Sequence, residues 1–151
     1  MTQTKYTSSR TEETRYLVTE FYRIITGAGS ALTLDEVIHP DIVIEEPAFF
    51  FHHGVHRGME AMKAISPIVG ELLDRSSIQV KSIVADGDKA FVVFTVEMAD
   101  NHDLALIAEY WEVRDGKLAV LRVFPHDPAP YQARQNRIVR ARADAMPSIS
   151  L

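Results

Sequence analysis

The chain has 151 residues, of which 46% are hydrophobic and 25% are charged, and its formal net charge is −5. These values are typical of one globular domain with its own core. The chain contains no cysteine, which excludes disulfides, zinc–thiolate centres and thiol nucleophiles and favours a cytoplasmic location. No apolar run approaches the roughly 20 residues of a membrane span, so we expect no membrane partner.

The charge is distributed unevenly along the chain. After Pro128, four arginines stand against the single acid Asp144, so the preceding part is more acidic than the total suggests. An acidic body lacks the basic face that nucleic-acid binding requires, and we expect no nucleic-acid partner. We divide the chain into a polar lead-in (1–10), one domain (11–127) and a basic tail that we expect to be helical (128–151).

The first predicted helix begins with a capping box. Ser9-Arg10-Thr11-Glu12 has the pattern that satisfies backbone donors at a helix N-terminus, and apolar residues recur at helical spacing as far as about Thr26. Gly27-Ala28-Gly29 should end this helix. Ser30 can cap a second helix, which must stop before Pro40.

A short strand and a long loop separate these helices from a third. Residues 41–46 are rich in β-branched side chains and end at Pro47, which indicates a strand. Residues 48–58 contain three phenylalanines and three histidines and are predicted to form a loop. Helical spacing resumes over residues 59–73, where Pro67 should kink or divide the helix.

The remainder of the domain is predicted to be β. Asp86-Gly87 and Asp115-Gly116 are strong signals for hairpin turns. Helices followed by an antiparallel sheet indicate an α+β domain. The four strands are predicted at Ile78–Ala85, Lys89–Met98, Leu104–Arg114 and Lys117–Phe124.

Two of these strands are apolar on both faces. In the strand 89–98, Phe91 and Val93 lie opposite the face that carries Val92 and Phe94, and the strand 104–114 repeats the pattern. An antiparallel sheet with one face in water would alternate apolar and polar residues. The helices can cover one face, so we expect a second subunit to cover the other and the protein to form a homodimer.

Two glutamates stand on apolar strand faces. Strand alternation places Glu109 on the face of Ile107 and Trp111, and Glu46 on the face of Ile44. Burial raises the pKa of a carboxyl, so that it can accept a proton near neutral pH or stay protonated and donate a hydrogen bond. The alternative is that each glutamate pairs with an arginine or lies at the rim of the sheet.

The histidines of the loop raise the question of a metal. His52, His53 and His56 together with Glu46 could bind zinc or iron. All three histidines share one loop, however, and no distant histidine follows at a recognisable spacing. We therefore expect no metal, and we consider His53 or His56 as an acid–base group against the alternative of ordinary loop histidines.

Several motifs resemble those of a known family. Ile44-Glu45-Glu46-Pro47 is similar to the Val-Glu-Asp-Pro of ketosteroid isomerases, and residues 94–98 are similar to their Phe-Arg-Val-Glu-Met strand. Tyr22 and Glu109 fall where that family has its oxyanion Tyr and protonated Asp. The chain thus resembles the nuclear transport factor 2-like superfamily, and within it the ketosteroid isomerases and SnoaL-like polyketide cyclases. The resemblance implies a cone-shaped, curved antiparallel sheet wrapped around N-terminal helices.

The resemblance also implies an activity. It suggests an acid–base enzyme that needs no cofactor and acts on a hydrophobic carbonyl compound through an enolate, as an isomerase, cyclase or dehydratase. Glu46 would remove a proton, Tyr22 and protonated Glu109 would stabilise the enolate, and His53 would be a second acid or base. The substrate would contact Phe50, Phe51, His56, Phe94 and Trp111.

Two other functions fit the same resemblance. One branch of the superfamily opens epoxides with an Asp–Arg–Asp arrangement, and no such arrangement is evident in the sequence at positions predicted to face the pocket. A binding or assembly module could use the same fold as a scaffold, because this fold hosts many functions. Both acidic positions are Asp in the isomerases and Glu in this chain, which moves each carboxyl outward by one methylene.

Overall fold

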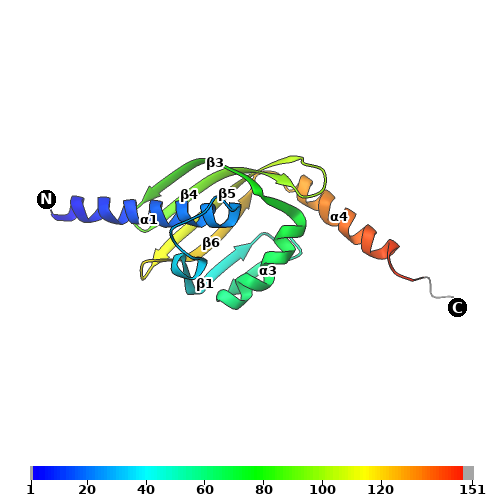
Figure 1. The fold of residues 1–151 in the computed structure, drawn as a ribbon, viewed down its shortest axis with the longest axis horizontal. Helices are drawn as coiled ribbons and strands as arrows, with labels where there is room; N and C mark the ends of the chain where they lie inside the picture. The colour runs from blue at the N-terminus through cyan, green and yellow to red at the C-terminus, as the bar shows by residue number, and fades with distance from the viewer. Residues whose placement is uncertain (1, 148–151) are drawn as a thin grey trace.

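Three helices lie against one face of a curved sheet, and a fourth helix follows the last strand (Figure 1). The computed structural model describes residues 2–147. The elements are α1 (Thr2–Thr26), α2 (Leu34–Val37), β1 (Ile38–Glu46), β2 (Gly54–Arg57), α3 (Met59–Leu72), β3 (Leu73–Asp86), β4 (Lys89–Met98), β5 (Leu104–Arg114), β6 (Lys117–Pro125) and α4 (Ala129–Asp144).

The sheet has six strands in the order β2-β1-β6-β5-β4-β3 and does not close. The strands β3 to β6 form the predicted antiparallel meander, with hairpins at both Asp-Gly turns. Strand β1 pairs with β6 in parallel, so the sheet is mixed where an antiparallel one was expected. Because a long stretch of chain separates β1 from β6, no hairpin turn sets their relative direction.

The two N-terminal helices differ from their predicted bounds. Helix α1 begins at Thr2 and passes through the capping box at Ser9, so the expected lead-in is helical. No glycine or proline interrupts residues 2–26, and a capping pattern alone does not stop a helix. Helix α2 begins after Thr33 instead of Ser30, because the backbone N–H of Thr33 donates to Glu36 Oε1 at 3.2 Å.

The middle of the chain is more regular than predicted. Helix α3 continues through Pro67, which lies on its exposed side. Strand β2 occupies part of the expected loop and pairs with β1. Strand β3 starts at Leu73, five residues before the predicted Ile78. Polar residues near its start concealed this first part of the strand.

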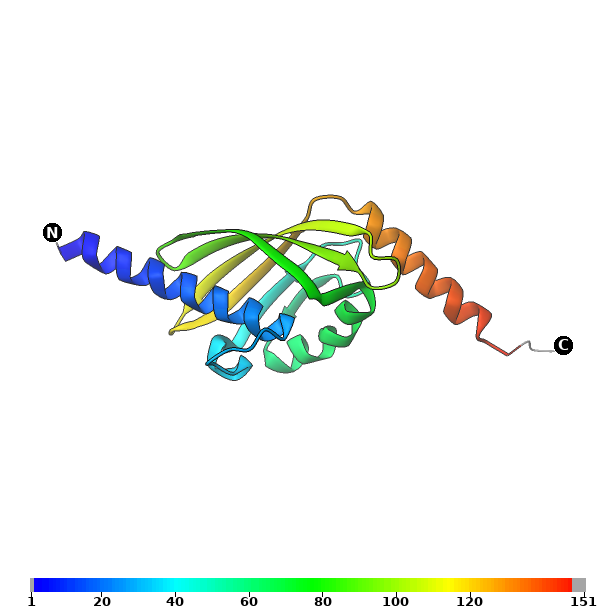
Figure 2. The same cartoon turned by 45° about the horizontal axis from the view of Figure 1, so that its top comes forward.

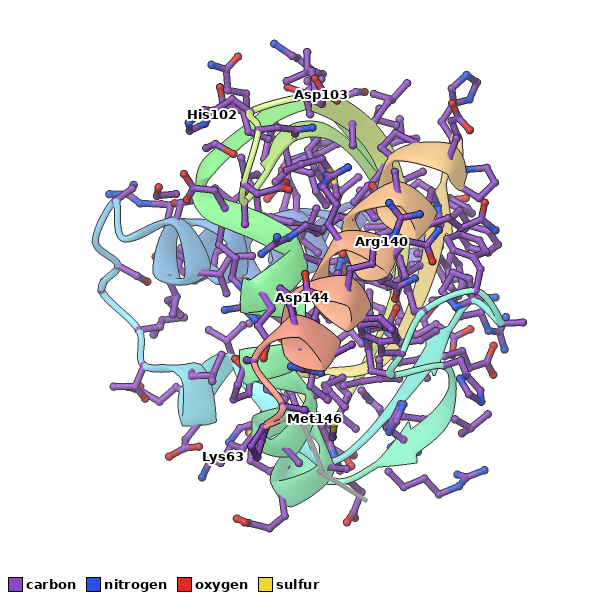
Figure 3. The ribbon with its side chains drawn as sticks, turned by 90° about the vertical axis from the view of Figure 1, so that its right-hand side faces the viewer. Lys63, His102, Asp103, Arg140, Asp144 and Met146 are labelled. Atoms are coloured by element: carbon purple, nitrogen blue, oxygen red, sulfur yellow. The ribbon has the colours of Figure 1, made fainter. Side chains whose placement is uncertain are left out.

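The core fills the space between the inner face of the sheet and the helices (Figure 2). Leu17, Val18 and Phe21 of α1 are buried there, as the apolar stripe indicated. Helix α4 lies over α3 at one end of the molecule (Figure 3), where Arg142 pairs with Glu71 at 2.8 Å. Within residues 2–147, no helix combines the length and apolar character needed to cross a membrane.

Candidate active site

A cavity of about 190 Å³ lies between the inner face of the sheet and helices α1 and α3. Its walls are mostly apolar and include Phe21, Phe94 and Ile107. Apolar walls with a few placed polar groups are typical of small-molecule sites. The polar residues of the lining are Glu46, His52, Lys63, Ser66, Arg75 and Glu109.

Glu109 reaches the cavity from the middle of β5. Strand alternation positions it, since Ile107 and Trp111 on the same face are buried. The Tyr22 hydroxyl donates a hydrogen bond to Glu109 Oε2, and Trp111 Nε1–H donates to the Tyr22 hydroxyl at 3.1 Å. Burial raises the pKa of Glu109 to about 7, and the hydrogen bond from Tyr22 opposes this rise because it stabilises the carboxylate.

Glu46 enters the same cavity from the end of β1. Its side chain is only 6% exposed, and its Oε2 has no hydrogen-bond partner among the described residues. The His52 Nε2 atom lies 3.7 Å from this oxygen. Burial raises the pKa of Glu46 to about 8, and the nearby negative charge of Glu109 adds to the rise. The two carboxyls therefore interact across one cavity.

His52 completes this group from the loop before β2. Its side chain is 2% exposed, and its ring stacks on Phe50 with centroids 4.8 Å apart. Within the described chain, the Nδ1 atom of His52 is buried without a hydrogen-bond partner. Burial lowers the pKa of His52 to about 4, and repulsion from His56 and His53 contributes. The imidazole is therefore neutral at pH 7 and can exchange a proton with a ligand or with Glu46.

Besides Glu46 and Glu109, four predicted site residues lie in or directly behind this cavity. Phe50 and Phe94 form part of its wall. Tyr22 is buried behind Glu109 and does not belong to the lining, so it contacts the site through its hydrogen bond to that carboxyl. Trp111 is fully buried one step further back, where an apolar wall position was expected, and supports Tyr22.

The other predicted residues lie outside the lining. Phe51 is 42% exposed, and the exposed His53 points its Nδ1 at the Phe50 carbonyl, 3.0 Å away. His56 Nε2 donates to the His52 carbonyl at 2.6 Å. Two successive turns in the loop are closed by Phe50 N–H and His53 N–H. They place Phe50 and His52 inside, and they leave Phe51 and His53 exposed. By position, His52 replaces His53 as the histidine of the site.

Three polar residues in or near this region were not among the predicted site residues. His52 was considered only as a metal ligand, and Arg75 lay outside any predicted element. Tyr131 of α4 is fully buried against Phe50, with its hydroxyl unpartnered among the described residues. A tyrosine in an otherwise polar helix was the available signal for Tyr131. Across residues 2–147, no group of three or more histidines and acids is placed to hold a metal ion.

Comparisons with known proteins agree with this architecture. The SnoaL-like domain family matches residues 18–121. An NTF2-like protein from Burkholderia xenovorans LB400 is 24% identical, with a TM-score of 0.63 over 82% of this chain and 95% of that one. Bal32a, from a soil-derived mobile gene cassette, is 15% identical, with a TM-score of 0.69 over 82% and 97%. TerC, co-crystallised with polyporic acid, is 18% identical, with a TM-score of 0.63 over 82% and 98%.

These structural neighbours establish the NTF2-like fold and nothing about the reaction, because their identities are low. No curated protein matches the chain.

Proposed function

Because the chain belongs to the SnoaL-like domain family, we propose that it is an acid–base enzyme acting on a hydrophobic carbonyl compound through an enolate. One observation carries this proposal. Glu46 and Glu109 share one apolar cavity, and of the two only Glu109 receives a hydrogen bond from the described residues. An asymmetric pair of acids with separated proton affinities provides one proton donor and one proton acceptor near neutral pH.

Hydrogen bonding decides which acid has which role. A carboxylate needs donors, and Glu109 has the Tyr22 hydroxyl, itself polarised by Trp111. Glu46 has no donor among the described residues and therefore keeps its proton to a higher pH. We assign Glu109 as the base and protonated Glu46 as the hydrogen-bond donor. This reverses the roles that the resemblance to ketosteroid isomerases implies.

In the proposed reaction, Glu109 and Glu46 each have one role. The Glu109 carboxylate takes the proton beside the substrate carbonyl, the electron pair of that C–H bond forms the C=C bond of the enolate, and the π pair of the carbonyl moves onto its oxygen. The Glu46 carboxyl donates a hydrogen bond to this oxyanion, and neutral His52, whose Nε2 lies 3.7 Å from Glu46 Oε2, adds no charge beside it. Return of the proton to another carbon gives isomerisation, while attack by the enolate carbon on a second carbonyl gives cyclisation.

A test of the enolate step does not require the natural substrate. We expect the protein to catalyse exchange of the α-protons of 2-tetralone in D2O, measured by NMR. Glu109→Gln should slow exchange by roughly 100- to 10,000-fold, the usual contribution of a general base. Glu46→Gln should cost less, because an amide still donates a hydrogen bond.

Glu45→Gln is the matched control for this experiment. Glu45 neighbours Glu46 on β1 but pairs with Arg122 at 2.7 Å on the surface, so its loss should leave exchange unchanged. A larger effect of Glu46→Gln than of Glu109→Gln would contradict the assigned roles. Absence of exchange above the buffer rate with the unmodified protein would contradict the enolate proposal itself.

The structure gives less support to an epoxide hydrolase. That chemistry would use two acids bridged by an arginine. Arg75 lines the cavity, but it forms no ion pair with Glu46, Glu109 or any other acid within the described residues.

We also propose that the protein is a homodimer through the outer face of the sheet. Phe91, Leu106 and Phe124 are 47%, 40% and 50% exposed there, and Phe91 packs against Tyr110 with ring centroids 5.0 Å apart. A stable interface should bury more than about 1,000 Å² in total. Sedimentation should show a dimer at micromolar concentration that Phe91→Glu converts to a monomer. A monomeric unmodified protein would contradict the proposal.

A further inference from the structure

Arg75 is a cation without an anion at the side of the cavity formed by α3 and β3. It is one of the cavity-lining residues and is partly buried. Its Nη2 donates to the carbonyl and the hydroxyl of Ser66, the latter at 3.2 Å. Gly70 adjoins the guanidinium, and a Cβ there would make an ordinary van der Waals contact, 3.5 Å from Arg75 Nη1. Helix α3 thus holds the group by neutral contacts alone.

Arg75 differs from the other arginines with fixed positions in the described chain because it combines the lack of a carboxylate partner with partial burial. Arg122, Arg134, Arg137 and Arg142 each pair with an acid at the surface. Arg15 and Arg23 bind backbone carbonyls but are exposed to water. Within the described chain, Arg75 has neither an acid nor full hydration, and its partial burial lowers its pKa. An unpaired, partly desolvated guanidinium is costly, and an anionic ligand would remove that cost.

We propose that Arg75 binds a carboxylate of the substrate, which is then an apolar keto acid with its ketone at Glu46 and Glu109. The planar fork of a guanidinium matches a carboxylate, and the Nε and Nη1 donors of Arg75 have no partner among the described residues. Arg75 lines the same cavity as Glu46 and Glu109 but makes no ion pair with either among the described residues, so its donors are available to the carboxylate of a ligand. The inference rests on the proposed function for the view that the cavity binds a small molecule.

Lys63 provides the comparison for this proposal. It also belongs to the cavity lining, but its side chain is 57% exposed and lies 3.8 Å from Glu60 on the same helix. A hydrated, loosely paired lysine contributes little to anion binding. Of the two cations, Arg75 should therefore dominate.

Two isosteric probes separate charge from shape. Cyclohexanecarboxylate and cyclohexyl methyl ketone share a ring and a carbonyl, and only the first is an anion. The chain has a single tryptophan, so the indole N–H signal of Trp111, which contacts Tyr22 at 3.1 Å, reports binding by NMR titration. We expect the unmodified protein to bind the carboxylate at least about tenfold more tightly than the ketone, as a charge-assisted hydrogen bond would give.

Variants then assign the preference to one residue. Arg75→Met should weaken binding of the carboxylate by about 10- to 100-fold and leave the ketone within about twofold. Lys63→Met should change neither affinity by more than about threefold. Arg75→Lys keeps the charge but loses the fork, so it should retain part of the preference; if Arg75→Met does not fold, this variant and the unmodified protein decide the question.

Two results would overturn the proposal. One is equal affinity of the unmodified protein for both probes, and the other is an equal loss of both probes in Arg75→Met. Exchange of 2-tetralone involves no carboxylate on the ligand, so that test of the enolate step and this test of the anion site can fail independently.

Discussion

The protein contains two groups of acids in opposite surroundings. At the surface, Asp100 lies 2.5 Å from Arg137 and 3.4 Å from Arg134, both on α4. Hydrogen bonding from Arg137 lowers the pKa of Asp100. In the cavity, Glu46 and Glu109 form no ion pair with a lysine or arginine among the described residues, and burial raises the pKa of both. The Asp100 ion pairs connect α4 to the turn after β4. Glu46 and Glu109 instead retain their protons to a higher pH than an exposed glutamate does.

This difference shows how the fold divides its charges between structure and chemistry. Paired acids at the surface are hydrated whether or not they pair, so each pair adds little stability. Acids in an apolar cavity are disfavoured once ionised, so they reduce the stability of the fold above neutral pH. Perturbed acids of this kind concentrate at functional sites. Three experiments test this difference between the two groups of acids.

The largest expected effect is on the pH dependence of 2-tetralone exchange. The reaction needs Glu109 ionised and Glu46 protonated, so the rate should rise through a pKa of about 7 and fall through a pKa of about 8. At pH 5 the rate should be about 100-fold below its maximum, since each pH step of one below the pKa costs about tenfold. Glu46→Gln should keep the rising limb and lose the falling one. A flat profile between pH 5 and pH 9 would contradict these roles.

A smaller effect is expected on stability. Each cavity acid binds its proton more tightly in the folded state than in the unfolded chain, where a glutamate pKa is about 4.3. The folded state therefore carries more protons between about pH 4.5 and pH 8, and stability should fall as pH rises through this range. At pH 9, Glu46→Gln should be more stable than the unmodified protein by on the order of 2 to 4 kcal/mol. A pKa difference of one between the folded and unfolded states corresponds to about 1.4 kcal/mol. The expected gain is smaller than the full pKa difference would give, because water reaches part of the cavity.

Denaturant melts at two pH values check this expectation. At pH 4 the Glu46 carboxyl is protonated in both states, so Glu46→Gln and the unmodified protein should have about the same free energy of unfolding. A Glu46→Gln protein that is less stable at pH 9 would mean that the Glu46 carboxylate is paired in solution, and the assignment of Glu46 as an unpaired acid would be wrong.

The smallest effect is expected at the surface. Asp100→Asn should lower the free energy of unfolding by about 0.2–1 kcal/mol, the usual contribution of an exposed ion pair, and the difference should shrink in 1 M salt. It should leave 2-tetralone exchange unchanged. A loss of several kcal/mol would show that α4 contributes more to the fold than its surface contacts suggest.

The fold and both cavity acids could be predicted from the sequence because they follow the short periodicities of helices and strands. Glu46 and Glu109 each lie two residues after a buried isoleucine, so the two-residue periodicity of a strand predicts that they share the inner face with it. The histidine of the site could not be predicted in this way. Two tight turns decide that His52 points inward and His53 outward, and turns of this kind leave no period in the sequence.

Long-range contacts account for the other differences. The parallel pairing of β1 with β6 joins segments that no local turn connects. Arg75 was not predicted as a site residue because the first residues of β3 are polar and the strand was predicted to start only at Ile78. Its position depends on Ser66 of a neighbouring helix, a juxtaposition that only the folded chain creates.

The central claim is that two cavity carboxyls keep their protons to near-neutral pH and release them in a fixed order. A ¹³C NMR titration of the side-chain carboxyls tests this directly, with Glu46→Gln and Glu109→Gln used to assign the signals. We predict that Glu109 titrates at about pH 7 and Glu46 afterwards, at about pH 8. Titration of either carboxyl below pH 5, or of Glu46 before Glu109, would contradict the claim.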